Sequence, residues 1–127
     1  MTGGVSTRDL QATMRVYYIN IDETSNKCDF TVQKSLAEAR YGHCQAYNNG
    51  AVYIIGGFDH EDIIGLPPST LSSCELYVPP EDKNGKAHVE QIGHLNVPRA
   101  YSGCCQIGSF IYVFGGLNGY ETLSSIE

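Results

Sequence analysis

Histidine and cysteine, the side chains that most often bind metals or act as nucleophiles, are scattered along this sequence. The histidines are His43, His60, His88 and His94, and the cysteines are Cys28, Cys44, Cys74, Cys104 and Cys105. Structural zinc needs four ligands at close, paired spacings, and the sequence has no Cys-x-x-Cys pair. The sequence therefore predicts no metal and no cofactor. We expect five reduced thiols, several of them buried as small hydrophobic side chains.

Cys104 and Cys105 are adjacent, and neighbouring side chains of a strand point to opposite faces. A redox role requires an exposed thiol with a lowered pKa, and only Arg99 could supply a positive charge nearby. We interpret the pair as buried and unreactive. No nucleophile with its base, pair of catalytic carboxylates or phosphate-binding glycine loop can be argued, so we expect a protein that is not an enzyme.

The most acidic stretch is Asp59-His60-Glu61-Asp62. It could bind a cation or a basic partner surface, but charged runs more often serve only to keep a loop solvated. Apolar residues and two prolines follow, up to residue 68. This mixture of acidic and apolar residues on one long loop is more suggestive of recognition than either feature alone.

The charge balance excludes several classes of partner. The 127 residues carry a formal net charge of -6 with only eight Lys and Arg, whereas nucleic acids and anionic membranes attract basic surfaces. The sequence contains no run of about 18 apolar residues, the length needed to cross a bilayer. Residues 1–5 lack the basic and apolar regions of a signal peptide. We expect no nucleic-acid partner, no membrane and a cytoplasmic or nuclear location.

The elements that must position these side chains form an internal repeat. Residues 40–57 match residues 99–116 without a gap at an offset of 59, and the match ends in Gly-Gly both times. Beyond the glycines, Leu-Ser-Ser-Cys-Glu (71–75) matches Leu-Ser-Ser-Ile-Glu (123–127) at an offset of 52. The loop before each is thirteen residues in one copy and six in the other. A third copy is indicated by Gly3-Gly4 and residues 14–20.

Each repeat predicts four strands. Ala51–Ile55 and Phe110–Phe114 are short unbroken apolar runs, which favours strands covered on both faces. More polar strands precede them (42–47 and 102–106), and Asn48-Asn49-Gly50 and Gly108-Ser109 are typical of hairpin turns. Third and fourth strands are expected at 76–78 and 87–92, and in the preceding copy at 16–21 and 30–34. The glycine pairs suit positive φ or the close approach of another sheet.

This ordered pattern resembles the kelch repeat over nearly the whole chain. The residues that carry the resemblance are Arg40, Tyr53, Gly56, Gly57, Glu75 and Tyr77 in one copy, and Arg99, Tyr112, Gly115 and Gly116 in the next. The usual Trp of the fourth strand is replaced by Phe30 and Val89, and Ala39 replaces the Pro before Arg40. The resemblance implies an all-β fold, a fragment of a kelch β-propeller with four-stranded antiparallel blades.

Three segments follow from this interpretation. Residues 1–38 form the end of one blade, 39–94 a complete blade and 95–127 the start of a further blade. Remaining blades of a longer chain are expected, because blades bury their faces only against neighbours. The isolated 127 residues should be weakly stable or self-associating through exposed end faces. We expect structural roles for His43 and for Arg40 and Arg99, which would pair with backbone carbonyls or with a carboxylate such as Glu75.

The resemblance also implies a function, that of a protein–protein interaction scaffold, such as a substrate-recognition or cytoskeletal adaptor module. In kelch proteins the binding face consists of loops. Carried onto this sequence these contain Tyr41, Gly42, Phe58, Asp59, His60, Glu61, Ala100, Tyr101, Ser102, Leu117, Asn118 and Tyr120. Tyr41, Phe58, Tyr101 and Tyr120 are the expected anchors, since aromatic residues dominate interface hot spots. The alternative is a kelch-type enzyme related to galactose oxidase or to sugar-processing propellers.

Overall fold

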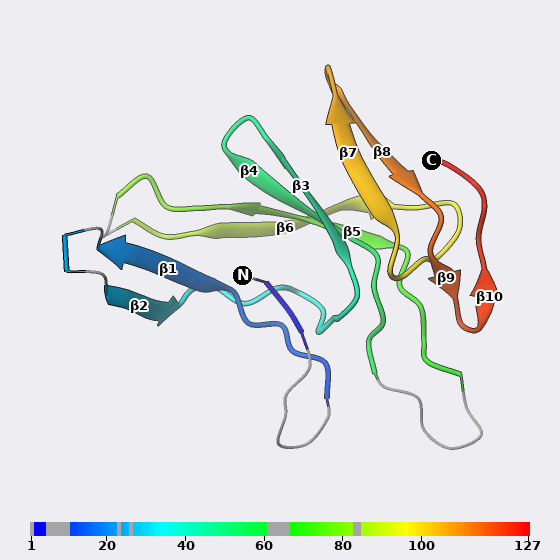
Figure 1. Ribbon diagram of the computed structural model, residues 1–127, viewed down its shortest axis with the longest axis horizontal. Coiled ribbons are helices and arrows are strands. Elements are labelled where there is room, and N and C mark those ends of the chain that lie inside the picture. Colours follow the sequence, from blue (N-terminus) through cyan, green and yellow to red (C-terminus); the bar gives the residue numbers. More distant parts are fainter. Residues whose placement is uncertain (1, 5–10, 23, 26, 61–66, 83–84) are drawn as a thin grey trace.

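The described part of the chain consists of strands and loops, without a helix (Figure 1). The computed structural model describes residues 2–4, 11–22, 24–25, 27–60, 67–82 and 85–127. The strands are β1 (Tyr17–Asp22), β2 (Lys27–Val32), β3 (Cys44–Asn48), β4 (Ala51–Ile55), β5 (Ser73–Val78), β6 (His88–His94), β7 (Gly103–Ile107), β8 (Phe110–Phe114), β9 (Leu117–Asn118) and β10 (Glu121–Thr122). In the residues described, no helix is long and apolar enough to cross a membrane.

The central unit is an antiparallel sheet of four strands in the order β3-β4-β5-β6. Its first hairpin turns at Asn49 and Gly50, whose φ angles are 49° and 80°. Two successive positive φ values characterise the type I′ turn, which matches the twist of paired strands and favours Asn-Gly. The register between β5 and β6 shifts at Cys74/Glu75, which marks an irregularity near the start of β5.

Partial sheets lie on either side of this unit, with the β1–β2 hairpin at one end of the molecule and β7–β8 at the other (Figure 1). A bridge between Thr2 and Val16 places the N-terminal segment beside the start of β1. A bridge between Phe114 and Ile126 places the C-terminal segment beside β8. The partial sheets on either side therefore repeat parts of the central sheet. The division at residues 38 and 94 stays a prediction, because sheet pairing alone does not delimit folding units.

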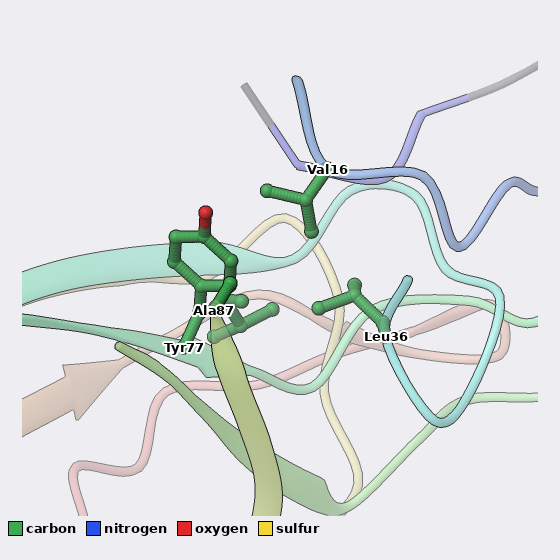
Figure 2. Close-up of a cluster of buried hydrophobic side chains, with 5 residues drawn as sticks. Val16, Leu36, Tyr77 and Ala87 are labelled. Carbon is green, nitrogen blue, oxygen red and sulfur yellow. The ribbon is translucent and has the colours of Figure 1, made fainter. Parts of the chain in front are cut away.

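β4 is covered on both faces, as its unbroken apolar sequence predicts. One face contributes Ile54 to a cluster with Val16, Leu36, Tyr77 and Ala87. This cluster joins the central sheet to the β1–β2 sheet, and Figure 2 shows Val16, Leu36, Tyr77 and Ala87 facing one another. The other face contributes Ile55 to a cluster with Cys44 and Val113, which joins it to β7–β8. Face-to-face packing of sheets thus accounts for the run of apolar residues.

β8 has the same kind of sequence but only one covered face. Val113 is buried and Ile111 packs beside it against the central sheet. The alternate residues Phe110, Tyr112 and Phe114 remain 68%, 39% and 43% exposed. The prediction that both faces of this strand are covered is therefore wrong for the described residues, which place no sheet over the face that carries Phe110, Tyr112 and Phe114. The expected exposed apolar end face is present here.

Candidate functional site

A buried arginine lies beneath the loops at the start of β3. The Nη1 atom of Arg40 donates to the carbonyl oxygens of Gly56 at 2.7 Å and Ser73 at 3.1 Å, and Nη2 forms a 2.6 Å ion pair with Glu75 Oε1. Both partners named from the sequence, backbone carbonyls and Glu75, are therefore present. These contacts tie the loop before β3 to the end of β4 and the start of β5.

The same arrangement recurs at Arg99. Its Nη1 donates to the carbonyl oxygens of Gly115 and Ser125, both at 3.1 Å, and Nη2 forms a 2.6 Å ion pair with Glu127. The partner glutamate could have been found from the sequence, because Glu75 and Glu127 occupy the same place in the 71–75 and 123–127 matches. The repeat thus reproduces a set of contacts as well as a set of residues.

Each of these glutamates also holds the chain that leads into its sheet. Glu75 accepts hydrogen bonds from the backbone N–H of Ala37 at 2.6 Å and Glu38 at 3.2 Å. Glu127 accepts them from Asn96 at 2.6 Å and Val97 at 3.0 Å. Burial alone would raise the pKa of Glu127, but the hydrogen bonds from Asn96, Arg99 and Val97 outweigh burial and lower it.

Neighbouring sheets touch through their main chains at the glycine pairs. A Cβ on Gly56 would lie 2.2 Å from the carbonyl oxygen of Arg99, and Gly57 N–H donates to that oxygen at 2.9 Å. One repeat earlier, Gly3 and Gly4 make the same contacts with Arg40, at 2.5 Å and 2.8 Å. Gly3-Gly4 therefore occupies the glycine-pair position that the third copy predicts. The first glycine of each pair has φ near 60°.

On the loop side of the buried arginines, short backbone bridges fix the loops in place. Tyr41 and Phe58 exchange two backbone hydrogen bonds at 3.0 Å and 2.8 Å. Ala100 and Leu117 do the same in the following repeat, both at 2.8 Å. The loop residues predicted from the sequence are thereby held beside one another at the end of each sheet.

Three aromatic rings from two neighbouring sheets form a cluster, which we call the aromatic cluster: Tyr41, Phe58 and Tyr101. The ring centroids lie 5.5 Å apart for Tyr41–Phe58, 6.4 Å for Tyr41–Tyr101 and 5.8 Å for Phe58–Tyr101. Phe58 is only 3% exposed, whereas Tyr101 is 62% exposed. Phe58 is thus not an exposed anchor as predicted; it supports the two tyrosines from within the protein.

The remaining predicted residues divide between surface and interior. Asp59 and His60 are partly exposed and their side chains contact each other, and the Tyr41 hydroxyl donates to the carbonyl oxygen of His60 at 3.2 Å. Ala100 is fully buried, so its part in the site is its backbone bridge. Gly42, Ser102, Leu117 and Asn118 are half-buried and Tyr120 is exposed, while Glu61 lies outside the described residues.

His43 has the structural, hydrogen-bonded setting expected for it. Its Nε2 lies 3.0 Å from the Thr2 hydroxyl and 2.9 Å from the Gln45 amide nitrogen. Burial, with the neighbouring Arg40 charge, lowers the pKa of His43 to about 4. The ring is therefore neutral at physiological pH. The contact between His43 and Thr2 could not be predicted from the sequence, because it spans two sheets.

All five cysteines are free. Burial, followed by the neighbouring Cys44 thiol, raises the pKa of Cys104 to about 12, so this thiol stays protonated and unreactive. Cys105 is exposed, so the prediction that both members of the pair are buried is wrong. The two side chains alternate across β7, and only one face of that strand is covered. The described residues contain no group of three or more His, Cys, Asp or Glu that could hold a metal ion.

The repeated sheets, the buried Arg–Glu pairs and the paired glycines define consecutive blades of a β-propeller. In agreement, residues 98–127 match the kelch motif. The solved structure of YjhT, a kelch-type propeller protein, superposes with a TM-score of 0.71 at 19% sequence identity. The alignment covers 98% of this chain and 37% of YjhT, so the chain spans little more than a third of that protein. No curated protein matches the sequence.

Proposed function

We propose that this chain is part of a non-catalytic protein-interaction scaffold that binds a partner protein at the aromatic cluster and the loops around it. The observation that carries the proposal is that Tyr41, Phe58 and Tyr101, from two neighbouring blades, converge there while Tyr101 stays 62% exposed. A substrate-recognition or cytoskeletal adaptor in the cytoplasm or nucleus is the kind of protein that this surface suits.

The rigidity of the site supports this role. The Tyr41–Phe58 backbone bridge and the buried Arg40 hold the loop bases, so little conformational freedom remains to be lost when a partner binds. Tyrosine offers a large apolar ring with a polar end and loses few rotamers on binding, and tyrosine is enriched in interface hot spots.

The charge of the chain supports a protein as the partner. The net charge of -6 opposes binding to nucleic acid or to an anionic membrane. The two arginines beneath the site are fully buried and neutralised by Glu75 and Glu127, so they offer no positive surface.

The test is affinity capture from a cell lysate with the full-length protein, comparing wild type with Tyr41→Ala and Tyr101→Ala together. Phe58 is left unchanged, because removing a buried ring would destabilise the fold. Tyr47→Ala is the matched control, since Tyr47 is 67% exposed and lies at the opposite end of β3. We expect the main captured protein to be lost only from the double variant. Equal recovery by all three proteins would place the binding site elsewhere.

A further inference from the structure

Tyr101 has a backbone conformation that is unfavourable for a tyrosine. Its φ angle is +51°, and Asn49 is the only other described non-glycine residue with a positive φ. The residue at the same place in the preceding repeat, at the offset of 59, is Gly42 with φ +61°. The backbone of the two blades therefore follows the same path, which glycine adopts without strain and a bulky residue adopts only at a cost.

The backbone contact at this position does not need a side chain. The N–H of Tyr101 donates to the carbonyl oxygen of Gly42 at 2.6 Å, and a glycine in its place could make the same bond. A tyrosine thus occupies a position where a glycine would suit the backbone conformation better. A strained residue at an exposed position is a reason to look for a role in binding.

The protein also makes room for this ring. A Cβ on Gly42 would lie 3.0 Å from Cε1 of Tyr101, so a side chain there would crowd the ring. On its inner side Tyr101 meets Tyr41 and Phe58 edge to face, with interplanar angles of 71° and 69°. The rest of the ring faces solvent, which leaves aromatic surface available to a partner.

The loops around the ring carry a carboxylate at Asp59, which directly follows Phe58. The rings of Phe58 and Tyr101 lie 5.8 Å apart, and the side chain of Asp59 is 40% exposed. None of the described loop residues 41–42, 58–60, 100–102 and 117–120 is a lysine or arginine. An exposed aromatic ring with one carboxylate on the adjacent loop, and no lysine or arginine among these described loop residues, fits a cationic side chain, above all the planar guanidinium of arginine.

We propose that Tyr101 is the residue that determines specificity on this face, and that it receives an arginine side chain from a segment of the partner protein. The guanidinium stacks on the Tyr101 ring, and Asp59 supplies the opposite charge. This inference rests on the proposed function, because it names the group that the same site recognises.

The probes are short peptides, Ser-Gly-X-Gly-Ser, in which X is arginine, citrulline or glutamate, titrated into the full-length protein with ¹³C-labelled tyrosine rings. Citrulline has nearly the shape of arginine without its charge. We expect the arginine peptide to shift the Tyr101 ring signals and to bind at least fivefold more tightly than citrulline, with glutamate weakest. Higher salt should weaken the arginine complex.

The decisive variants are Tyr101→Gly, which restores the residue of the preceding repeat, and Tyr101→Phe, which keeps the ring. Tyr101→Gly should melt at the same or a higher temperature than wild type and bind the arginine peptide at least fivefold more weakly. Tyr101→Phe should retain binding. A stable Tyr101→Gly protein that still binds arginine as tightly would overturn the inference.

Other outcomes separate this inference from the proposed function. Preference for glutamate, or no binding of any peptide, would refute the arginine assignment. If the captured partner were nevertheless lost on Tyr41→Ala with Tyr101→Ala, the proposed function would stand without it. If capture were also unaffected, both proposals would fail.

Discussion

Arg40 and Glu75 form an ion pair of 2.6 Å in which both side chains are almost completely withdrawn from solvent. The pair lies between the loop that enters β3 and the beginning of β5. Because Glu75 also accepts two backbone N–H groups, its charge is compensated by three donors, all from residues 37–40, the segment that leads into β3. The start and the middle of the blade are thereby joined at the level of the loops that form the candidate site.

Replacing Arg40 by Met should destabilise the full-length protein by about 3–5 kcal/mol, because the Glu75 carboxylate would remain buried without its cation. The double variant Arg40→Met with Glu75→Leu should lose less than the single one, since no buried carboxylate is left without its cation; Glu38, which also pairs with Arg40, is 46% exposed. Urea unfolding of the three proteins measures the difference. Equal losses for the single and double variants would show that the charge pair is not what holds this junction.

Gly56→Ala should be much more harmful than Gly50→Ala, although both glycines have a positive φ. At Gly50 an added Cβ meets nothing within 4 Å, so only the backbone strain of about 1–2 kcal/mol applies. At Gly56 the Cβ would meet the Arg99 carbonyl oxygen at 2.2 Å, which forces the two blades apart. We expect a total loss of about 3 kcal/mol or more. Similar melting temperatures for the two variants would contradict the close approach of the main chains.

His43 should make the protein less stable in mild acid. Its pKa is lowered from 6.5 to about 4 in the folded protein, so between these values the unfolded chain takes up a proton that the folded chain does not. Stability attributable to His43 is thus complete above pH 6.5 and falls as the pH drops towards 4, by about 3 kcal/mol in all.

The measurement is the free energy of unfolding from pH 7 to pH 4 for wild type and His43→Gln. The difference between the two curves isolates His43 from the carboxylates, which also titrate in this range. Wild type should lose more stability over that interval. Parallel curves would mean that the imidazole is accessible to protons in the folded state.

The apolar face of β8 should drive association of the 127-residue chain. Phe110 and Phe114 remain largely exposed although the equivalent strand β4 is covered on both faces. Phe110→Glu should lower the mean mass measured by light scattering after gel filtration. Gln91→Glu, which adds the same charge at an exposed site of β6, should leave the mass unchanged. A wild-type chain that stays monomeric at high concentration would refute the expectation.

Strand positions and repeat equivalences could be predicted from the sequence because they depend on local patterns. The predicted strands at 42–47 and 102–106 correspond to β3 and β7 within one or two residues, and Ala51–Ile55 and Phe110–Phe114 match β4 and β8. The partner of Arg40 was predictable for a similar reason, since a buried guanidinium needs a carboxylate and carbonyl oxygens.

The candidate site was only partly predictable, because its character depends on contacts between blades. Phe58 follows a glycine pair on a loop, which suggests exposure, yet rings from two blades cover it. The exposure of Phe110 and Cys105 depends on whether another sheet follows, which their own sequence cannot indicate. The backbone strain at Tyr101 could have been predicted, because the matching residue of the other repeat is Gly42.

The loop between β4 and β5 is closed by a 2.7 Å hydrogen bond from Leu71 N–H to the Gly57 carbonyl oxygen, and the loop after β8 by the equivalent 2.9 Å bond from Leu123 to Gly116. One loop has thirteen residues and the other six, yet equivalent backbone hydrogen bonds close both of them. Mutation can therefore lengthen, shorten or replace such a segment without disturbing the sheet that carries it. Over evolutionary time, new partners could be acquired by exchanging these inserts while the architecture is inherited unchanged.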